Sequence, residues 1–158
     1  RASAMHELAR QSGSSGVVGG EVLDIESEGQ APDLATLLTI HRRKTGALMA
    51  ASCAIGGILA GGTLEQVEDL RSYGAALGLA FQIVDDILNE TATVEALGKA
   101  VGSDRALGKM TYPALMGTDA ATQEANRLVG SALQHLDSLP GETGWLRDLA
   151  SFAVERQR

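Results

Sequence analysis

The stretch Phe81–Pro113, FQIVDDILNETATVEALGKAVGSDRALGKMTYP, decides how the rest of the sequence is interpreted. It continues the apolar run GAALGLA of residues 74–80, whose length and content of alanine and leucine predict a buried helix rather than a strand. Asp85 and Asp86 follow directly within this pattern. The predicted helix therefore carries two neighbouring carboxylates out of its buried portion.

Four polar residues of this helix fall at spacings of three and four, so their side chains can converge along one stripe: Gln82, Asp85, Asp86 and Asn89. Buried carboxylates need a cation or hydrogen-bond donors. Ligands that are all oxygen favour a hard ion such as Mg²⁺, which often bridges carboxylates to the phosphates of a substrate. Lys99 and Lys109, in the glycine-containing segment downstream, suit such phosphates. Taken alone, two adjacent aspartates are equally typical of a solvated helix end.

Composition limits the possible functions. With 158 residues and 44% apolar composition, the chain can bury a core and should be one domain or part of one. Its formal charge is −7 and no basic cluster is longer than Arg42–Lys44, so nucleic acid is not expected as a partner. There is no run of about 18 apolar residues, so a membrane span is not expected. The single cysteine, Cys53, can form no internal disulfide, which fits the reducing cytoplasm.

Helical periodicity extends over almost the whole chain and no strand signal interrupts it, so the predicted fold class is all-α. Asp33 is a predicted N-cap, and Thr63 with Gln66 has capping-box spacing before the long helix that ends near Glu90. A loop is expected over residues 91–109, and Pro113 should begin the next helix. The last helix is expected to pack through five apolar residues: Trp145, Leu146, Leu149, Phe152 and Ala153.

A basic cluster interrupts the apolar segment 34–60. Lys44 and Thr45 directly precede Gly46, which indicates a kink or break where the backbone and the lysine can approach an anion. The alternative interpretation is a solvated Arg-Arg-Lys turn.

The order of residues adds a family resemblance. Phe-Gln, Asp-Asp-x-x-Asn, Gly-Lys, Gly-Ser-Asp, Gly-Lys and Thr-Tyr-Pro follow one another as in the second aspartate-rich region of the trans-isoprenyl diphosphate synthases, or polyprenyl synthetases, and bacterial farnesyl diphosphate synthases are the most similar. Two upstream motifs resemble the same family in content and spacing: Gly19–Asp24, GGEVLD, and His41–Gly46, HRRKTG.

The resemblance implies an isoprenoid-synthase-type helical bundle around a central cavity. It covers residues 1–158 as the C-terminal portion of a single synthase domain whose N-terminal half is absent, and it implies a homodimer. Composition alone predicts a flexible loop over residues 13–20, GSSGVVGG. The resemblance implies instead that this stretch is helical and that Gly19 and Gly20 lie within a continuous helix, where the missing side chains allow a neighbouring helix or substrate to come close.

The resemblance further implies a Mg²⁺-dependent prenyltransferase that condenses an allylic diphosphate with isopentenyl diphosphate and releases diphosphate. Farnesyl diphosphate is the expected product, and this portion alone is expected to be inactive. Asp85 would bind Mg²⁺ directly, with Asp86 and Asn89 ordering its water shell. The residues expected around the allylic diphosphate are Lys44, Thr45, Gln82, Lys99 and Lys109, with Asp104 further out. Asp85, Asp86 and Lys44 are the expected catalytic residues.

Two positions depart from the family pattern. The family usually has aspartate at the position of Asn89, and losing that charge should weaken metal binding. It usually has glutamine at the position of Glu21, which adds a negative charge beside an anionic pocket. A catalytically degenerate helical subunit, or a regulator of a partner prenyl synthase, is therefore the alternative function.

Overall fold

The computed structural model describes residues 1–31, 33–91 and 109–155, and every regular element in that part of the chain is a helix. The all-α prediction is confirmed. In order, the elements are α1 (Ala2–Ser12), α2 (Val17–Glu26), α3 (Leu34–His41), the π-helical turn η1 (Arg42–Gly46), α4 (Ala47–Leu59), α5 (Leu64–Thr91), α8 (Tyr112–Met116), α9 (Thr118–His135) and α10 (Gly144–Glu155).

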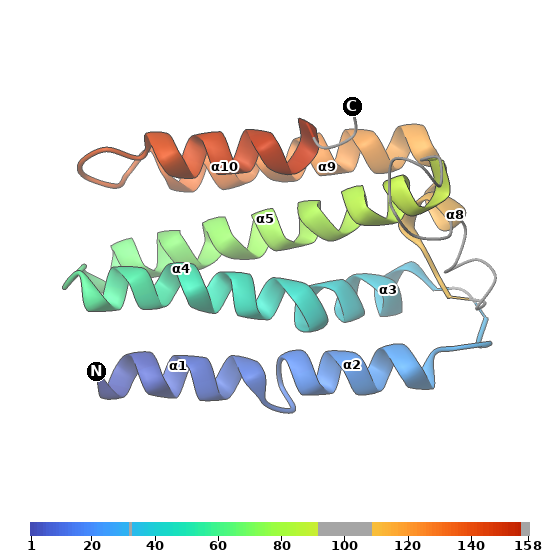
Figure 1. Cartoon of the computed structure of the whole chain (residues 1–158), viewed down its shortest axis with the longest axis horizontal. Helices are drawn as coiled ribbons and strands as arrows, with labels where there is room; N and C mark the ends of the chain where they lie inside the picture. The colour runs from blue at the N-terminus through green and yellow to red at the C-terminus, as the bar shows by residue number, and fades with distance from the viewer. Residues whose placement is uncertain (32, 92–108, 156–158) are drawn as a thin grey trace.

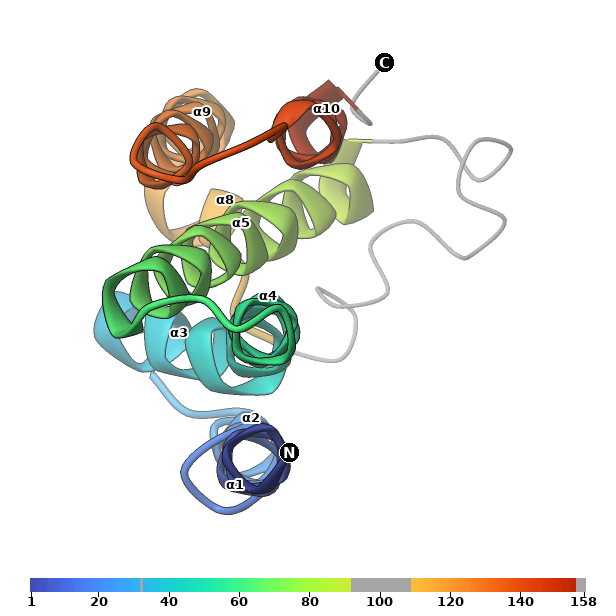
Figure 2. The ribbon, with the colours of Figure 1, turned by 90° about the vertical axis from the view of Figure 1, so that its left-hand side faces the viewer.

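The helices form layers that follow the order of the chain (Figure 1). The lowest layer holds α1 and α2 end to end, the next holds the continuous path of α3, η1 and α4, and α5 crosses above it. The top layer is made of α9 and α10, which lie side by side in the perpendicular view (Figure 2). The long helix α5 is thus covered on two opposite sides.

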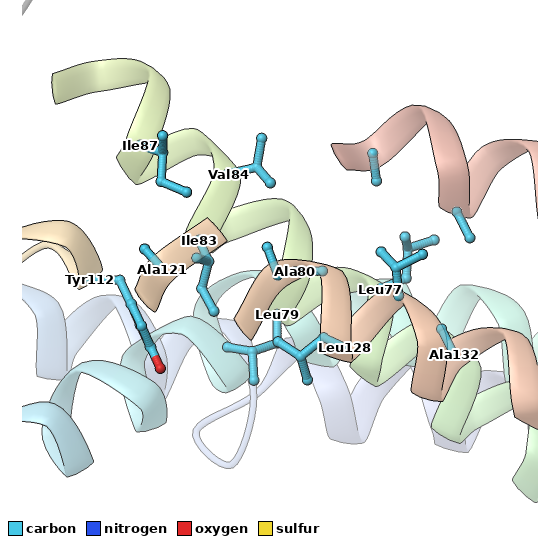
Figure 3. Close-up of a cluster of buried hydrophobic side chains, with 14 of the residues drawn as sticks. Leu77, Leu79, Ala80, Ile83, Val84, Ile87, Tyr112, Ala121, Leu128 and Ala132 are labelled. Atoms are coloured by element: carbon cyan, nitrogen blue, oxygen red, sulfur yellow. The ribbon is translucent and has the colours of Figure 1, made fainter. Parts of the chain in front are cut away.

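The core is built around α5 (Figure 3). Tyr73, Ala80, Ile83 and Val84 are fully buried along this helix. Small residues of α9 face them, which lets the two helices pack closely: Ala121, Ala125 and Ala132. Burial of a large apolar side chain contributes roughly 1.5–3 kcal/mol, so α5 is the main source of stability in this part of the fold.

The predicted caps are confirmed. Asp33 accepts hydrogen bonds from the backbone N–H groups of Ala35 and Thr36 at the start of α3. Thr63 and Gln66 exchange reciprocal hydrogen bonds of 2.9 and 3.2 Å at the start of α5. Pro113 lies in the first turn of α8. Local sequence therefore determines where these helices begin.

The continuous helix expected through the first glycines is wrong. Residues 13–16 form turns between α1 and α2. Gly13 and Gly16 adopt extended or irregular backbone angles, and a Cβ atom on Gly16 would lie 1.8 Å from the carbonyl oxygen of Gln11. The Gly-Gly pair itself does lie within α2, as expected.

Gly20 gives α2 its close approach to the next layer. A Cβ atom at this position would lie 2.4 Å from the backbone nitrogen of Lys44 and 2.8 Å from Cβ of Arg43. The expected role of the missing side chain is confirmed here, because α2 reaches the backbone of η1 at this point. Gly78 likewise lets α5 come close to η1. Its hypothetical Cβ would lie 2.8 Å from Cα of Gly46.

The expected packing of the last helix is confirmed for Leu146 and Ala153 and wrong for the other three residues. Trp145 is 87% exposed, Leu149 51% and Phe152 60%. The buried residues of α10 are Ala150 and Ala153. A face of alanines lets α10 lie close to α5 and α9, with Leu146 partly buried against the same core.

Large apolar side chains are also exposed on the lowest layer: Met5, Leu8, Val18, Val22 and Ile25. They occupy both helices of the layer, α1 and α2. Across residues 1–31, 33–91 and 109–155, no helix combines the length and the apolar character that crossing a membrane requires.

The close approach at Gly20 predicts that adding one methyl group at this position lowers the stability of the fold. Gly20→Ala should destabilise the protein by about 1–3 kcal/mol, because backbone atoms of η1 occupy the space that the methyl group needs. Gly56→Ala is the matched control, since Gly56 lies within α4 and nothing is within 4 Å of its hypothetical Cβ. That change should stabilise by about 0.5–1 kcal/mol. Urea unfolding of the two variants checks both signs, and equal stability would contradict the packing described.

Candidate functional site

A cavity of about 260 Å³ lies between α2, the junction of α3 and η1, α5, and the segment that precedes α8. Its lining combines apolar, acidic and basic side chains: Asp24, Leu37, Ile40, His41, Lys44, Gln82, Asp85, Asp86, Lys109, Met110 and Thr111. Five of the residues predicted from sequence are therefore brought to one hollow: Lys44, Gln82, Asp85, Asp86 and Lys109.

Asp86 makes several hydrogen bonds within the cavity wall. It is 5% exposed and comes from α5. Its Oδ2 lies 3.0 Å from Nε2 of His41 and accepts a 2.8 Å hydrogen bond from the backbone N–H of Tyr112. Its Oδ1 accepts from Nε2 of Gln82 at 3.3 Å. This carboxylate thereby joins the end of α3, the helix α5 and the start of α8.

The network continues from Gln82 into the motif at η1. With its amide nitrogen donating to Asp86, Gln82 presents its Oε1, which accepts a 2.9 Å hydrogen bond from the hydroxyl of Thr45. The orientation of the amide is determined by these two contacts, because only the nitrogen can donate and only the oxygen can accept. Thr45, Gln82, Asp86 and His41 thus form one connected set of side chains.

Lys44 lies beside this network and is held by two acids of α2. Its Nζ is 2.7 Å from Oδ2 of Asp24 and 2.7 Å from Oε2 of Glu21. Burial disfavours the ammonium, but hydrogen bonds and attraction from both carboxylates outweigh it and raise the pKa of Lys44 above its ordinary value. Lys44 therefore keeps its positive charge throughout the neutral pH range.

Asp85 and Lys109 complete the polar lining. Asp85 is exposed and lines the cavity one residue before the buried Asp86. Nζ of Lys109 lies 3.8 Å from Oδ2 of Asp24, so Asp24 contacts both lysines. Asn89 is half-buried and does not line this cavity. Lys99, Asp104 and the loop expected around them fall outside the described residues.

A second hollow of about 300 Å³ adjoins Lys44 along the first turns of α4. Lys44, Thr45, Leu48, Met49 and Ser52 line it. Lys44 and Thr45 are thus at the boundary between a charged cavity and a surface with two large apolar side chains. This arrangement suits a ligand with an anionic end and an apolar chain.

The cavity wall offers oxygen ligands to a divalent cation. Among residues 1–31, 33–91 and 109–155, no three His, Cys, Asp or Glu side chains gather as a preformed metal cage. Asp85 nevertheless offers an exposed carboxylate on the cavity wall, and Mg²⁺ commonly takes one or two carboxylates together with substrate phosphates and water. The residues therefore fit a cation that arrives with a phosphorylated ligand, and Asp85 is the carboxylate that would hold it.

Sequence reasoning missed two members of the site. His41 begins the motif HRRKTG, and no role is predicted for it from the sequence. The residue is only 5% exposed, and its ring contacts Asp86. Asp24 likewise ended a quoted motif, and it links both lysines. The available signal was the position of each polar residue at the end of an apolar helical run, where burial of a charged group requires a partner.

A comparison with known protein families finds one family that matches most of the chain. The sequence pattern of the family described as polyprenyl synthetase matches residues 3–141. The chain belongs to the polyprenyl synthetase family. The matched range includes every described residue of the cavity wall.

Individual relatives carry prenyl synthase names. The chain is 40% identical over 162 residues to farnesyl diphosphate synthase of Escherichia coli K12, covering 100% of this chain and 54% of that protein. It is 42% identical over 159 residues to the large subunit 2 of a heterodimeric geranylgeranyl pyrophosphate synthase of Arabidopsis thaliana, covering 98% and 42%. The chain thus spans about half the length of the curated relatives it matches.

Solved structures confirm the isoprenoid-synthase type of fold. A polyprenyl synthase from Caulobacter crescentus CB15, in complex with calcium and isoprenyl diphosphate, aligns with a TM-score of 0.90 at 30% identity. The alignment covers 99% of this chain and 60% of that one.

Asp85 and Asp86 should respond differently to substitution. Asp86→Ala should lower the free energy of unfolding by about 2–4 kcal/mol, because it leaves buried hydrogen-bond donors without an acceptor. Asp85→Ala, one residue away and exposed, should change it by less than about 1 kcal/mol. Denaturant unfolding of both variants measures the contrast, and a larger loss at Asp85 would refute the assignment of Asp86 as the structural carboxylate.

Proposed function

We propose that this chain forms part of a Mg²⁺-dependent trans-prenyltransferase that condenses an allylic diphosphate with isopentenyl diphosphate and releases diphosphate. Farnesyl diphosphate is the proposed product. The observation that carries the proposal is the convergence of Lys44, Lys109 and Asp85 on one cavity whose wall is built by the Asp86 network. Membership of the polyprenyl synthetase family supports the same reaction class.

The lysines would bind the diphosphate. Lys44 and Lys109 place two ammonium groups on the cavity, and charge-assisted hydrogen bonds from such groups to phosphate oxygens are among the stronger ones in proteins. As the carbon–oxygen bond of the allylic substrate breaks, negative charge grows on the leaving diphosphate. Fixed positive groups near that charge lower the barrier to ionisation.

Asp85 would hold the metal, and Mg²⁺ supplies charge neutralisation of the diphosphate when bound. Asp86 is assigned a positioning role, since three hydrogen bonds engage its two oxygens. Through Gln82 it orients Thr45 at the boundary of the apolar hollow. Leu48 and Met49 in that hollow would contact the prenyl chain and exclude water from it.

We also propose that the chain is the C-terminal portion of a single synthase domain. Two observations support this: the chain spans about half of its relatives' length, and apolar side chains are exposed along α1 and α2. The homodimer and the cytoplasmic location expected from the sequence stay predictions.

A non-catalytic subunit is the second candidate function. The specific observation that favours it is the engagement of Lys44 by both Glu21 and Asp24, which reduces the positive charge presented to a ligand. A heterodimeric relative shows that the family includes synthases built from two kinds of subunit.

One assay distinguishes the two candidate functions. The complete protein is incubated with Mg²⁺, isopentenyl diphosphate and geranyl diphosphate, and the prenyl products are resolved by chain length. We expect one main product, farnesyl diphosphate. Asp85→Asn should lower kcat by about 100-fold or more, because a metal ligand loses its charge.

Asp148→Asn is the matched control, since Asp148 is exposed on α10, away from the cavity, and should leave turnover unchanged. Removal of Mg²⁺ by a chelator should abolish product formation. Absence of any product from the intact protein would favour the non-catalytic subunit, and full activity of Asp85→Asn would remove Asp85 from the mechanism.

A further inference from the structure

Lys44 contacts two carboxylates, which is more than is needed to position a lysine for binding an anion. Its Nζ is 2.7 Å from a carboxylate oxygen of Asp24 and 2.7 Å from one of Glu21. Both acids come from α2, one helical turn apart, and the close approach at Gly20 brings their helix against the backbone of Lys44. The pairing is therefore built into the contact between α2 and η1.

The charges around the cavity make this pairing important for anion binding. Four carboxylates lie on or beside the described wall, on Glu21, Asp24, Asp85 and Asp86, whereas only Lys44 and Lys109 supply ammonium groups. An anion that binds Lys44 must compete with carboxylates already in contact with the same nitrogen. Any interaction that is present only in the empty site weakens ligand binding by its own strength.

The two acids differ in how firmly they are held. The Asp24 side chain is 20% exposed, lines the cavity and contacts both lysines. The Glu21 side chain is 49% exposed, and in the described part of the chain its ion pair with Lys44 is its one recorded polar contact. Glu21 can therefore turn into solvent without breaking other interactions of the site, while Asp24 cannot.

We propose that Glu21 is an intramolecular competitor for Lys44 and that this ion pair sets how tightly the site binds diphosphate. The inference deepens the proposed function, because it assigns an affinity-determining residue to the same site. Glu21 acts through Lys44 and does not need to touch the ligand. Asp24 positions Lys44, and Glu21 must be displaced from it as the anion binds.

The test is calorimetric titration of the complete protein with inorganic diphosphate at constant Mg²⁺ concentration. Glu21→Gln keeps the size of the side chain and removes its charge. It should tighten binding by about two- to fivefold, the range expected from the strength of a partly exposed ion pair. The gain should shrink as salt is raised, because added ions screen the competing charge.

Glu26→Gln is the matched control, since Glu26 is exposed on the same helix and has no ion pair with Lys44. It makes the same change in net charge and should leave diphosphate affinity within twofold of the parent protein. A double-mutant cycle with Lys44→Met isolates the contact. In the Lys44→Met background, Glu21→Gln should bring no gain, because the residue for which Glu21 competes is gone.

Equal affinities for Glu21→Gln and Glu26→Gln would overturn the inference, as would a gain that persists without Lys44. Failure to detect diphosphate binding to either the parent or Glu21→Gln would overturn it too. The proposed function is tested separately by prenyl product formation. A protein without turnover whose diphosphate affinity rises specifically in Glu21→Gln would refute the synthase and retain the competition at Lys44.

Discussion

The carboxylate of Asp86 needs hydrogen-bond donors because only 5% of the residue is exposed to water, and the fold supplies them from three elements. His41 comes from the end of α3, Gln82 from the preceding turn of α5, and the backbone N–H of Tyr112 from the start of α8. Leaving such a group unpaired would cost several kcal/mol. The relative placement of these elements, and with it the cavity that they line, therefore depends on satisfying one buried charge.

Local features of this fold were predictable because they depend on residues close in sequence. The caps at Asp33 and Thr63 involve partners two or three residues away. The pair of His41 and Asp86 joins residues 45 positions apart, so spacing alone could not predict it. The family motifs gave Lys44, Gln82 and Asp85 as site residues without indicating which acids would contact the lysine.

The error at α10 has a different physical origin. A helix with Trp145, Leu149 and Phe152 on one side has the pattern of a buried face, and the pattern is the same whether or not another element covers it. Alanines at positions 150 and 153 make the contact instead, because small side chains let helix axes come closer. Periodicity therefore identifies an apolar face correctly and leaves its partner undetermined.

Because Arg42–Gly46 form a π-helical turn, the position of the site residues depends on the number of residues between His41 and α4. A π-turn accommodates one residue more than an α-turn, and each residue of an α-helix advances by about 100° around the axis. Loss of one position here would restore a regular α-helix, and the helical residues on either side would keep their faces, because the π-turn holds the extra residue locally. The alanines at 47, 50 and 54 would still face α5, but Lys44 or Thr45 would leave the wall of the two hollows. A homologous gene with a single-codon deletion in this segment would therefore encode a protein with a regular helix here but without the convergence of side chains that forms the site.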